Sequence, residues 1–360
     1  MNIAKPYASV SLSEAATMVK RLGDKVTILF SGEMGIGKSS ILKTLKDDLG
    51  DKYHYCYADM TTKDVGDFLI PSISEVDGVK VSSFIPNEEF GFHLNKPVVL
   101  MLDEIGKANR AVLNACLRLM LERCLGTYSL PEGSIVFATT NLAIEGLGDV
   151  LPPHARNRVV QCKIRKSTGM EWIENFAIDN GVHPVVIGAA MEYPDMFESF
   201  ENVEDPNQNH KIFHPKAPRP AFVTPRGLKA ASDILHACSD LSDSIKTHML
   251  IGAIGEAAAM DLMTLHKLDE DLPTWEQIIA APDTTKVPKS AAASCMLVAK
   301  AVARVERESF DSWMAYVKRM PKEAAALFTK TIIRNKTKSS IAVTNQDFNE
   351  WSRQNLFLFT

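Results

Sequence analysis

The sequence predicts an α/β fold: a largely parallel sheet of about five strands, followed by a long helical part. Short apolar runs alternate with helical patterns up to about residue 165, which is typical of a sheet covered by helices. The runs contain few polar residues, as expected of parallel strands that are buried on both faces. From Pro225 to the carboxyl terminus, helical patterns dominate, and one of these helices is expected from Asp243 to Leu265.

The expected strands are the apolar runs Val26 to Phe30, Tyr53 to Tyr57, Val98 to Leu102, Ser134 to Thr139 and the weaker Arg158 to Ile164. Helices are expected at Leu12 to Leu22, Lys38 to Leu49 and Lys107 to Cys124. Ser13 is the candidate cap of the first helix, with Ser11 as the alternative. In the third helix apolar residues recur on one face, as they do in a helix that covers a sheet.

The stretch from Thr62 to Pro97 interrupts this alternation. It holds two strand-like pieces, Ile70 to Val76 and Lys80 to Phe84, on either side of a turn signal that contains Asp77 and Gly78. We therefore expect a hairpin-bearing insertion ahead of the third strand.

The composition is typical of a globular intracellular protein, with 46% hydrophobic residues, 23% charged residues and a formal net charge of -4. This charge lacks the global basic excess of a dedicated nucleic-acid binder, although a local basic face stays possible. The six cysteines are scattered without a pair motif, as in a protein whose thiols stay reduced. The amino terminus lacks the apolar core of a signal peptide, and no run approaches the roughly 20 residues that span a bilayer. We predict a cytoplasmic protein with no membrane span.

Residues Gly32 to Ser39, GEMGIGKS, match the phosphate-binding pattern G-x-x-x-x-G-K-[ST] between an apolar strand and a helix. The glycines let backbone N–H groups wrap around phosphates, the lysine reaches the β- and γ-phosphates, and the serine hydroxyl ligates Mg²⁺. The helix that follows points its positive end at the anion. A glycine-rich turn without a ligand is the alternative, and the strand–loop–helix setting argues against it. The expected ATP-binding residues are Gly32, Glu33, Met34, Gly35, Ile36, Gly37, Lys38, Ser39 and Ser40.

An acidic pair, Asp103 and Glu104, ends the apolar run VVLML. A strand that ends in an acid places a carboxylate at the carboxyl edge of the sheet, beside the phosphate-binding loop. Asp103 would then join Ser39 in holding Mg²⁺. Glu104 would polarise the attacking water as a general base. The alternative is that the two acids only cap the following helix.

The chain resembles the AAA+ superfamily, and within it the MoxR-like branch. The resemblance rests on four stretches: GEMGIGKS, DVGDFLIP, VVLMLDEIGKANRAVLNACLRLMLERCLGTYSLP and VFATTN. It covers roughly Thr27 to Arg158 well and continues loosely through FVTPRGL, whereas about the last 80 residues do not align. The resemblance implies an AAA+ P-loop NTPase core with a five-stranded parallel sheet, followed by an α-helical lid and a helical carboxyl-terminal extension. The corresponding segments are the core at 1–165 with its insertion at 62–97, a helical connector at 166–221, the lid at 222–282 and the extension at 283–360.

The resemblance also implies roles for single residues. Asn141 lies where the family places a polar sensor that orients the attacking water, although an asparagine that caps a turn is the alternative. LPPHARNRV looks like the arginine-finger segment, with Arg158 as the finger and Arg156 as a second inter-subunit arginine. Because Val159 stands where the family more often has Phe, which arginine is the finger stays open, as does a role in surface salt bridges. Arg226, in Thr-Pro-Arg at the expected start of the lid, resembles the arginine that contacts nucleotide in its own subunit.

Partners follow from the same resemblance. It implies a homo-oligomer, most often a hexameric ring, that remodels a protein client in a chaperone-like way, often with a von Willebrand factor A-domain partner. The insertion matches a hairpin that faces the ring pore, where Phe84, Phe90 and Phe92 would touch a client. For any single one of these aromatics we favour packing against its own domain.

Two rival functions stay open. A nucleic-acid motor or loader would need a basic pore lining, whereas acids outnumber lysines in the insertion. Those acids are Asp64, Asp67, Glu75, Asp77, Glu88 and Glu89, against Lys63, Lys80 and Lys96. A nucleotide-gated scaffold with low turnover is the other rival, and the presence of both Glu104 and Asn141 argues against it.

Overall fold

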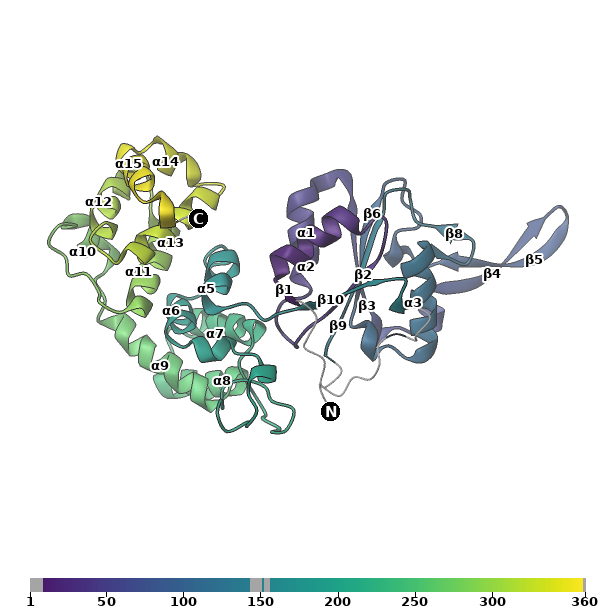
Figure 1. Cartoon of the computed structure of the whole chain (residues 1–360), viewed down its shortest axis with the longest axis horizontal. Coiled ribbons are helices and arrows are strands. Elements are labelled where there is room, and N and C mark those ends of the chain that lie inside the picture. The colour runs from purple at the N-terminus through teal and green to yellow at the C-terminus, as the bar shows by residue number, and fades with distance from the viewer. Residues whose placement is uncertain (1–8, 143–150, 152–155, 359–360) are drawn as a thin grey trace. The chain divides into compact units, whose positions relative to one another are not determined.

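The computed structural model describes residues 9–142, 151 and 156–358, and the chain divides into two compact units, Met1–Lys166 and Ser167–Thr360. The first unit is built on a parallel sheet of six strands in the order β1-β10-β2-β9-β6-β3 (Figure 1). The strands are β1 (Ser9–Val10), β2 (Ile28–Ser31), β3 (His54–Asp59), β6 (Val98–Asp103), β9 (Ile135–Thr140) and β10 (Val160–Ile164).

The predicted α/β class with a parallel sheet is confirmed, but the predicted number of five strands was wrong. The sixth strand is β1, which pairs with Lys163 and Ile164 at one edge of the sheet. It is only two residues long. Two residues show no periodicity, so the sequence held no signal for this strand.

Helices cover both faces of this sheet. Helices α1 (Leu12–Leu22) and α2 (Ser40–Leu49) lie on one face and α3 (Arg110–Glu122) lies on the other (Figure 1). Along β6, Val99 and Met101 join the core under α1 and α2, whereas Val98, Leu100 and Leu102 join the core under α3. Successive side chains of a strand point to opposite faces, so a strand covered on both sides is apolar at every position. This is the physical reason for the run VVLML.

Local caps fix where the helices begin. The cap of α1 is Ser11 rather than Ser13, because the Glu14 N–H donates to Ser11 Oγ at 3.2 Å and the Ser11 N–H donates to Glu14 Oε2 at 2.7 Å. Helix α3 starts later than expected because Asn109 accepts the Val112 N–H and caps it. Short 3₁₀ turns fill other connections: η1 (Gly50–Lys52), η2 (Met60–Thr62), η3 (Val65–Asp67), η4 (Glu88–Phe90) and η5 (Ile105–Lys107).

The insertion contains the expected hairpin, formed by β4 (Leu69–Val76) and β5 (Val79–Pro86) in antiparallel register. It projects from the first unit as a two-stranded ribbon (Figure 1). A smaller hairpin that the sequence did not predict, β7 (Cys124–Leu125) with β8 (Tyr128–Ser129), follows α3.

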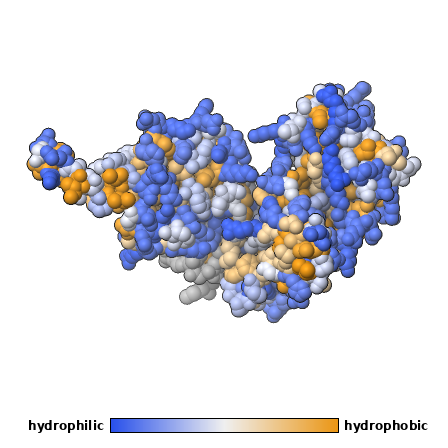
Figure 2. All heavy atoms as spheres, turned by 180° about the vertical axis from the view of Figure 1, so that it is seen from behind, coloured by the Kyte–Doolittle hydropathy of each residue, from blue (hydrophilic) through white to orange (hydrophobic). Residues whose placement is uncertain are grey.

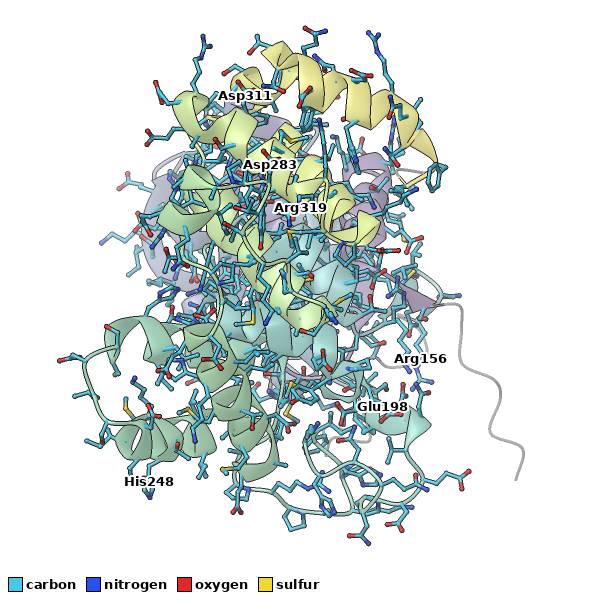
Figure 3. The ribbon with its side chains drawn as sticks, turned by 90° about the vertical axis from the view of Figure 1, so that its left-hand side faces the viewer. Arg156, Glu198, His248, Asp283, Asp311 and Arg319 are labelled. Atoms are coloured by element: carbon cyan, nitrogen blue, oxygen red, sulfur yellow. The ribbon has the colours of Figure 1, made fainter. Side chains whose placement is uncertain are left out.

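The second unit is helical. Its helices are α5 (Gly169–Trp172), the π-helical turn η7 (Ile173–Ala177), α6 (Pro184–Glu192), η8 (Pro194–Phe197), η9 (Phe200–Asn202), α7 (Pro225–Ala237), α8 (Asp243–Ile254), α9 (Glu256–Glu270), α10 (Trp275–Ala280), α11 (Ala291–Arg304), α12 (Arg307–Val317), α13 (Lys322–Arg334), α14 (Ser339–Thr344), α15 (Gln346–Gln354) and η10 (Leu356–Leu358). They enclose one apolar core that includes Trp172 and Trp313. Arg319 fastens the loop beside Asp283 by donating to the carbonyls of Pro282 and Thr285 (Figure 3).

A helix expected from Asp243 to Leu265 is broken in two at Gly255. Gly255 has a φ of 84°, and a Cβ there would lie 2.8 Å from the carbonyl oxygen of Ala221. Backbone conformation and close packing therefore both require glycine at this bend. No helix within the described residues is long and apolar enough to cross a membrane.

Candidate nucleotide-binding site

Three segments that the sequence singled out meet at the carboxyl edge of the sheet. The loop Gly32 to Ser39 follows β2, Asp103 ends β6, and Asn141 follows β9, which lies between those two strands. The Gly32 N–H donates to the Thr140 carbonyl at 3.3 Å and joins the first and third segments. Ligands of parallel α/β sheets bind at this edge.

The phosphate-binding loop is folded around the side chain of Lys38. Gly35 and Gly37 have φ angles of 70° and 99°, in the left-handed region that favours glycine. Lys38 is only 6% exposed, and its Nζ donates to the carbonyls of Gly32 and Glu33, each at 2.9 Å. The same Nζ donates to Asn141 Oδ1 at 2.6 Å. The structure therefore brings the predicted lysine and the predicted sensor into direct contact.

Asp103 is held by donors on both carboxylate oxygens. Oδ2 accepts the hydroxyls of Ser39 and Tyr57, each at 2.9 Å. Oδ1 accepts the Glu104 N–H at 3.0 Å and also the Thr139 hydroxyl. Burial raises the pKa of Tyr57, and the charge of Asp103 raises it further, so the phenol stays protonated and donates. The orientation of this buried carboxylate is therefore fixed by four hydrogen bonds.

The oxygens of Ser39 and Asp103 fit a magnesium ion. A hydroxyl and a carboxylate are hard oxygen ligands of the kind that Mg²⁺ prefers, and here they lie 2.9 Å apart beside the phosphate-binding loop. Mg²⁺ at these two residues would neutralise charge on bound phosphates. Both residues stand where the sequence predicted them to meet.

Glu104 has a strained backbone. Its φ of 55° and ψ of 36° lie in the left-handed region, which costs a non-glycine residue on the order of 1–2 kcal/mol. Such strain gathers at functional sites. The Glu104 side chain is 23% exposed, and its buried Oε2 lies 3.0 Å from Lys107 Nζ. Within the described residues Oε2 has this ion pair but no well-aligned hydrogen bond. Glu104 thus offers an ionisable group at the site, as a general base requires.

The candidate arginines lie outside this cluster of hydrogen bonds. Arg156 Nε donates to the Leu151 carbonyl at 2.8 Å, and residues 152–155 of the same segment lie outside the described residues. Arg158 is exposed near Glu122, whose pKa is lowered mainly by its hydrogen bond with Arg118 and to a small extent by the charge of Arg158. Arg226 is exposed in the first turn of α7, in the second unit. All three roles stay predictions.

Two residues of the site were missed by sequence analysis. Tyr57 and Thr139 both bind Asp103 through their hydroxyls. Each lies near the carboxyl end of its strand, β3 or β9, on either side of β6 in the sheet. Their strand-end position was the available signal, but it becomes informative only once the order of the strands is known.

The three aromatics of the insertion are not equivalent. Phe90 is fully buried and stacks on Phe68, with ring centroids 5.1 Å apart, and Phe92 packs partly buried against the same core. Phe84 lies on the hairpin with 47% of its surface exposed. Packing within the domain therefore accounts for Phe90 and Phe92 but not for Phe84.

Residues 27–141 match the family model of the AAA domain, dynein-related subfamily. This segment is an AAA domain. It contains every residue of the cluster around Lys38 and Asp103, from the phosphate-binding loop to Asn141. The match of this segment to that family supports nucleotide binding, usually with Mg²⁺.

Two solved structures are similar to this chain at low identity. A proposed ATPase of Cytophaga hutchinsonii is 16% identical over 47% of this chain and 50% of its own, with a TM-score of 0.34. This match therefore spans half of that protein's length. A mutant of RuvB from Thermotoga maritima is 14% identical over 84% of this chain and 85% of its own, with a TM-score of 0.36. Identities and TM-scores this low carry no argument about function. No curated protein matches the sequence.

Proposed function

We propose that the chain is a Mg²⁺-dependent ATPase of the MoxR-like branch of the AAA+ superfamily, and that it acts in a hexameric homo-oligomeric ring to remodel a protein client. The observation that carries the proposal is the convergence of Lys38, Ser39, Asp103 and Asn141 within an AAA domain. The reaction is ATP and water to ADP and phosphate.

Each group of the site has a task in this reaction. The amides of the phosphate-binding loop and Lys38 bind the β- and γ-phosphates, and Ser39 and Asp103 hold Mg²⁺. Glu104 accepts a proton from the water that attacks the γ-phosphorus, while the bond between that phosphorus and the ADP oxygen breaks. Asn141, in contact with Lys38, orients that water.

The proposed ring rests on the arginines. Arg158 is exposed on the AAA unit, with Arg156 two residues before it. An arginine finger acts on the γ-phosphate of a neighbouring subunit and stabilises the charge that develops there. The exposed guanidinium of Arg158 is accessible to such a neighbour, which supports a site that is shared between subunits. The number six and a von Willebrand factor A-domain partner rest on the family resemblance.

A protein client is supported by the hairpin β4–β5. Its exposed side chains are largely apolar: Ile70, Ile73, Val76, Val79, Val81, Phe84 and Ile85. Figure 2 shows these apolar side chains along the projecting arm. Exposed apolar patches of this kind mark sites of protein interaction. The charges near the turn are Glu75, Asp77 and Lys80, a balance that does not favour a polyanion such as DNA.

The proposal is tested by the effect of polymers on ATP turnover. We expect an extended apolar polypeptide, such as a permanently unfolded protein, to stimulate phosphate release several-fold in the presence of Mg²⁺. Single-stranded and duplex DNA at equal mass should leave the rate unchanged. Stimulation by DNA and not by polypeptide would instead support a nucleic-acid motor.

A further inference from the structure

Tyr57 reaches the magnesium-binding carboxylate from a neighbouring strand. It lies on β3, where it pairs with Met101 of β6, two residues before Asp103. Residues two apart on a strand share a face, so Tyr57 and Asp103 lie on the same face of the sheet. The Tyr57 hydroxyl donates to Asp103 Oδ2 at 2.9 Å.

Each of the two carboxylate oxygens of Asp103 accepts hydrogen bonds from a different pair of donors. Oδ1 is held by the N–H of Glu104, the residue directly after β6, and by the hydroxyl of Thr139, which is buried on β9. Oδ2 is held by Ser39 and Tyr57. Ser39 is itself an expected Mg²⁺ ligand, so its hydroxyl oxygen would coordinate the metal while its hydroxyl hydrogen is donated to Asp103. In the described structure, Tyr57 is the donor to Oδ2 that has no such second task.

We propose that Tyr57 is a positioning residue that holds Asp103 Oδ2 toward Ser39 and thereby sets the affinity of the site for Mg²⁺ with nucleotide. This inference rests on the proposed function. A hydrogen bond to an ionised acceptor is about twice as strong as one between neutral groups, so its loss lets the carboxylate turn away from the metal. Tyr57 is 45% exposed, so removal of its hydroxyl leaves the apolar core of the sheet in place.

The matched control is Tyr55, two residues earlier on the same strand. Its hydroxyl donates to the Gly50 carbonyl at 2.8 Å, away from Asp103. Tyr55→Phe and Tyr57→Phe therefore remove the same atom from the same face of β3, and only the second removes a contact with the carboxylate.

The test is the binding of a fluorescent ADP analogue during a Mg²⁺ titration, repeated in EDTA. For Tyr57→Phe we expect the half-saturating Mg²⁺ concentration to rise about tenfold, as for the loss of one charge-assisted hydrogen bond. Affinity in EDTA should stay within twofold of wild type, because the phosphate-binding loop is untouched. Tyr55→Phe should follow the wild-type titration.

Three results would overturn the inference. One is a Mg²⁺ titration of Tyr57→Phe that overlays the wild type or moves to lower Mg²⁺, in which case the proposed function still stands. The second is an equal loss of affinity with and without Mg²⁺, which would mean general damage to the site. The third is wild-type protein that binds the analogue without any Mg²⁺ dependence, which would remove the proposed function as well.

Discussion

Lys107 is the residue that holds the proposed general base. Its Nζ lies 3.0 Å from Glu104 Oε2, and both side chains are partly exposed. The pair spans the short turn η5 directly after the strained backbone of Glu104. Within the described residues Oε2 has no well-aligned hydrogen bond, so the ion pair with Lys107 is what orients the Glu104 carboxylate.

Replacement of Lys107 by Met should therefore slow the chemical step. We expect kcat for ATP to fall about three- to tenfold, because the carboxylate loses its fixed direction, while the KM for ATP changes little. Lys107→Arg, which keeps the charge, should stay close to wild type. Steady-state phosphate release measures both constants. A rise in kcat for Lys107→Met would mean instead that the ion pair holds the Glu104 carboxylate away from the attacking water.

The residues of the site that the sequence predicted share one property, which is a local pattern. Lys38 and Ser39 stand within a single motif, and Asp103 and Asn141 each end an apolar run. Tyr57 belongs to the same site but carries no motif, because its role depends on β3 lying next to β6. Adjacency of strands distant in sequence is a tertiary property that no local window contains.

The hairpin β4–β5 is an element with two exposed apolar faces. The pair Ile70 and Ile85 lies on one face, and Ile73 and Phe84 lie on the other, all at least 47% exposed. A two-stranded ribbon in water is marginally stable by itself, and exposed apolar area of this extent marks a contact surface. Under the proposed function, this ribbon is the surface that the client polypeptide covers.

The double variant Ile73→Thr with Val79→Thr should weaken that contact. Thr keeps the β-branched shape that suits a strand, and both side chains are exposed, so the melting temperature should change little. Each Thr replaces apolar surface worth about 0.8 kcal/mol per methyl-sized group, so the two together should weaken a covered contact by about 1.5 kcal/mol. We expect about tenfold more polypeptide to be needed for half-maximal stimulation of ATP turnover. Val343→Thr, at an exposed position of α14, is the control. An unchanged half-maximal concentration in the double variant would exclude the hairpin as the contact.

His183 couples the stability of the helical unit to pH. It caps α6 by accepting the Val185 N–H at Nδ1. Its pKa is lowered from 6.5 to about 3, chiefly by burial and also by the charges of His236, His266, Lys300 and Lys246, which come from α7, α9, α11 and α8.

The sign of the effect follows from the lowered pKa. Below pH 6.5 His183 binds a proton in the unfolded chain but stays unprotonated in the folded unit. The free energy of unfolding therefore falls as the pH drops towards 3. Between pH 7 and pH 5 the lowered pKa of His183 should reduce the free energy of unfolding by about 2 kcal/mol. Urea unfolding followed by tryptophan fluorescence reports this unit, because all four tryptophans lie within it. His183→Asn, which keeps a capping acceptor, should flatten the pH dependence. An equal slope in both proteins would assign the effect to other groups.

Helices and strands with long hydrophobic patterns were predicted well, whereas capping hydrogen bonds decide the residues at which the helices begin. The run of β6 and the two strands of the hairpin have nearly the expected bounds. The bend at Gly255 was missed because its cause is contact with Ala221, more than 30 residues away in the chain.

The proposed ring requires catalytic sites that are each formed by two neighbouring copies of the chain. Arg158→Ala and Glu104→Gln should each abolish turnover, the first by removing the finger and the second by removing the base. In a mixed ring, a subunit with Arg158→Ala keeps its own Glu104 and receives an intact finger from a Glu104→Gln neighbour. An equal mixture should then recover activity at about one quarter of its sites.

The recovery is measured by comparing the rate of phosphate release of the mixture with that of each variant alone. The same experiment with Arg156→Ala in place of Arg158→Ala identifies which arginine is the finger. A mixture as inactive as its components would show that neither arginine acts on a neighbouring site.

The proposed function requires that the cluster at the ends of β2, β6 and β9 cleaves ATP. Its most direct measurement follows ATP binding and phosphate release in the same samples of wild type and Glu104→Gln, with Mg²⁺ and with EDTA. We expect wild type to turn over ATP only with Mg²⁺, and Glu104→Gln to bind ATP with wild-type affinity while its turnover falls by about a hundredfold or more, the size of a general-base contribution. Turnover that persists in Glu104→Gln, or wild type that binds ATP and never releases phosphate, would contradict the account.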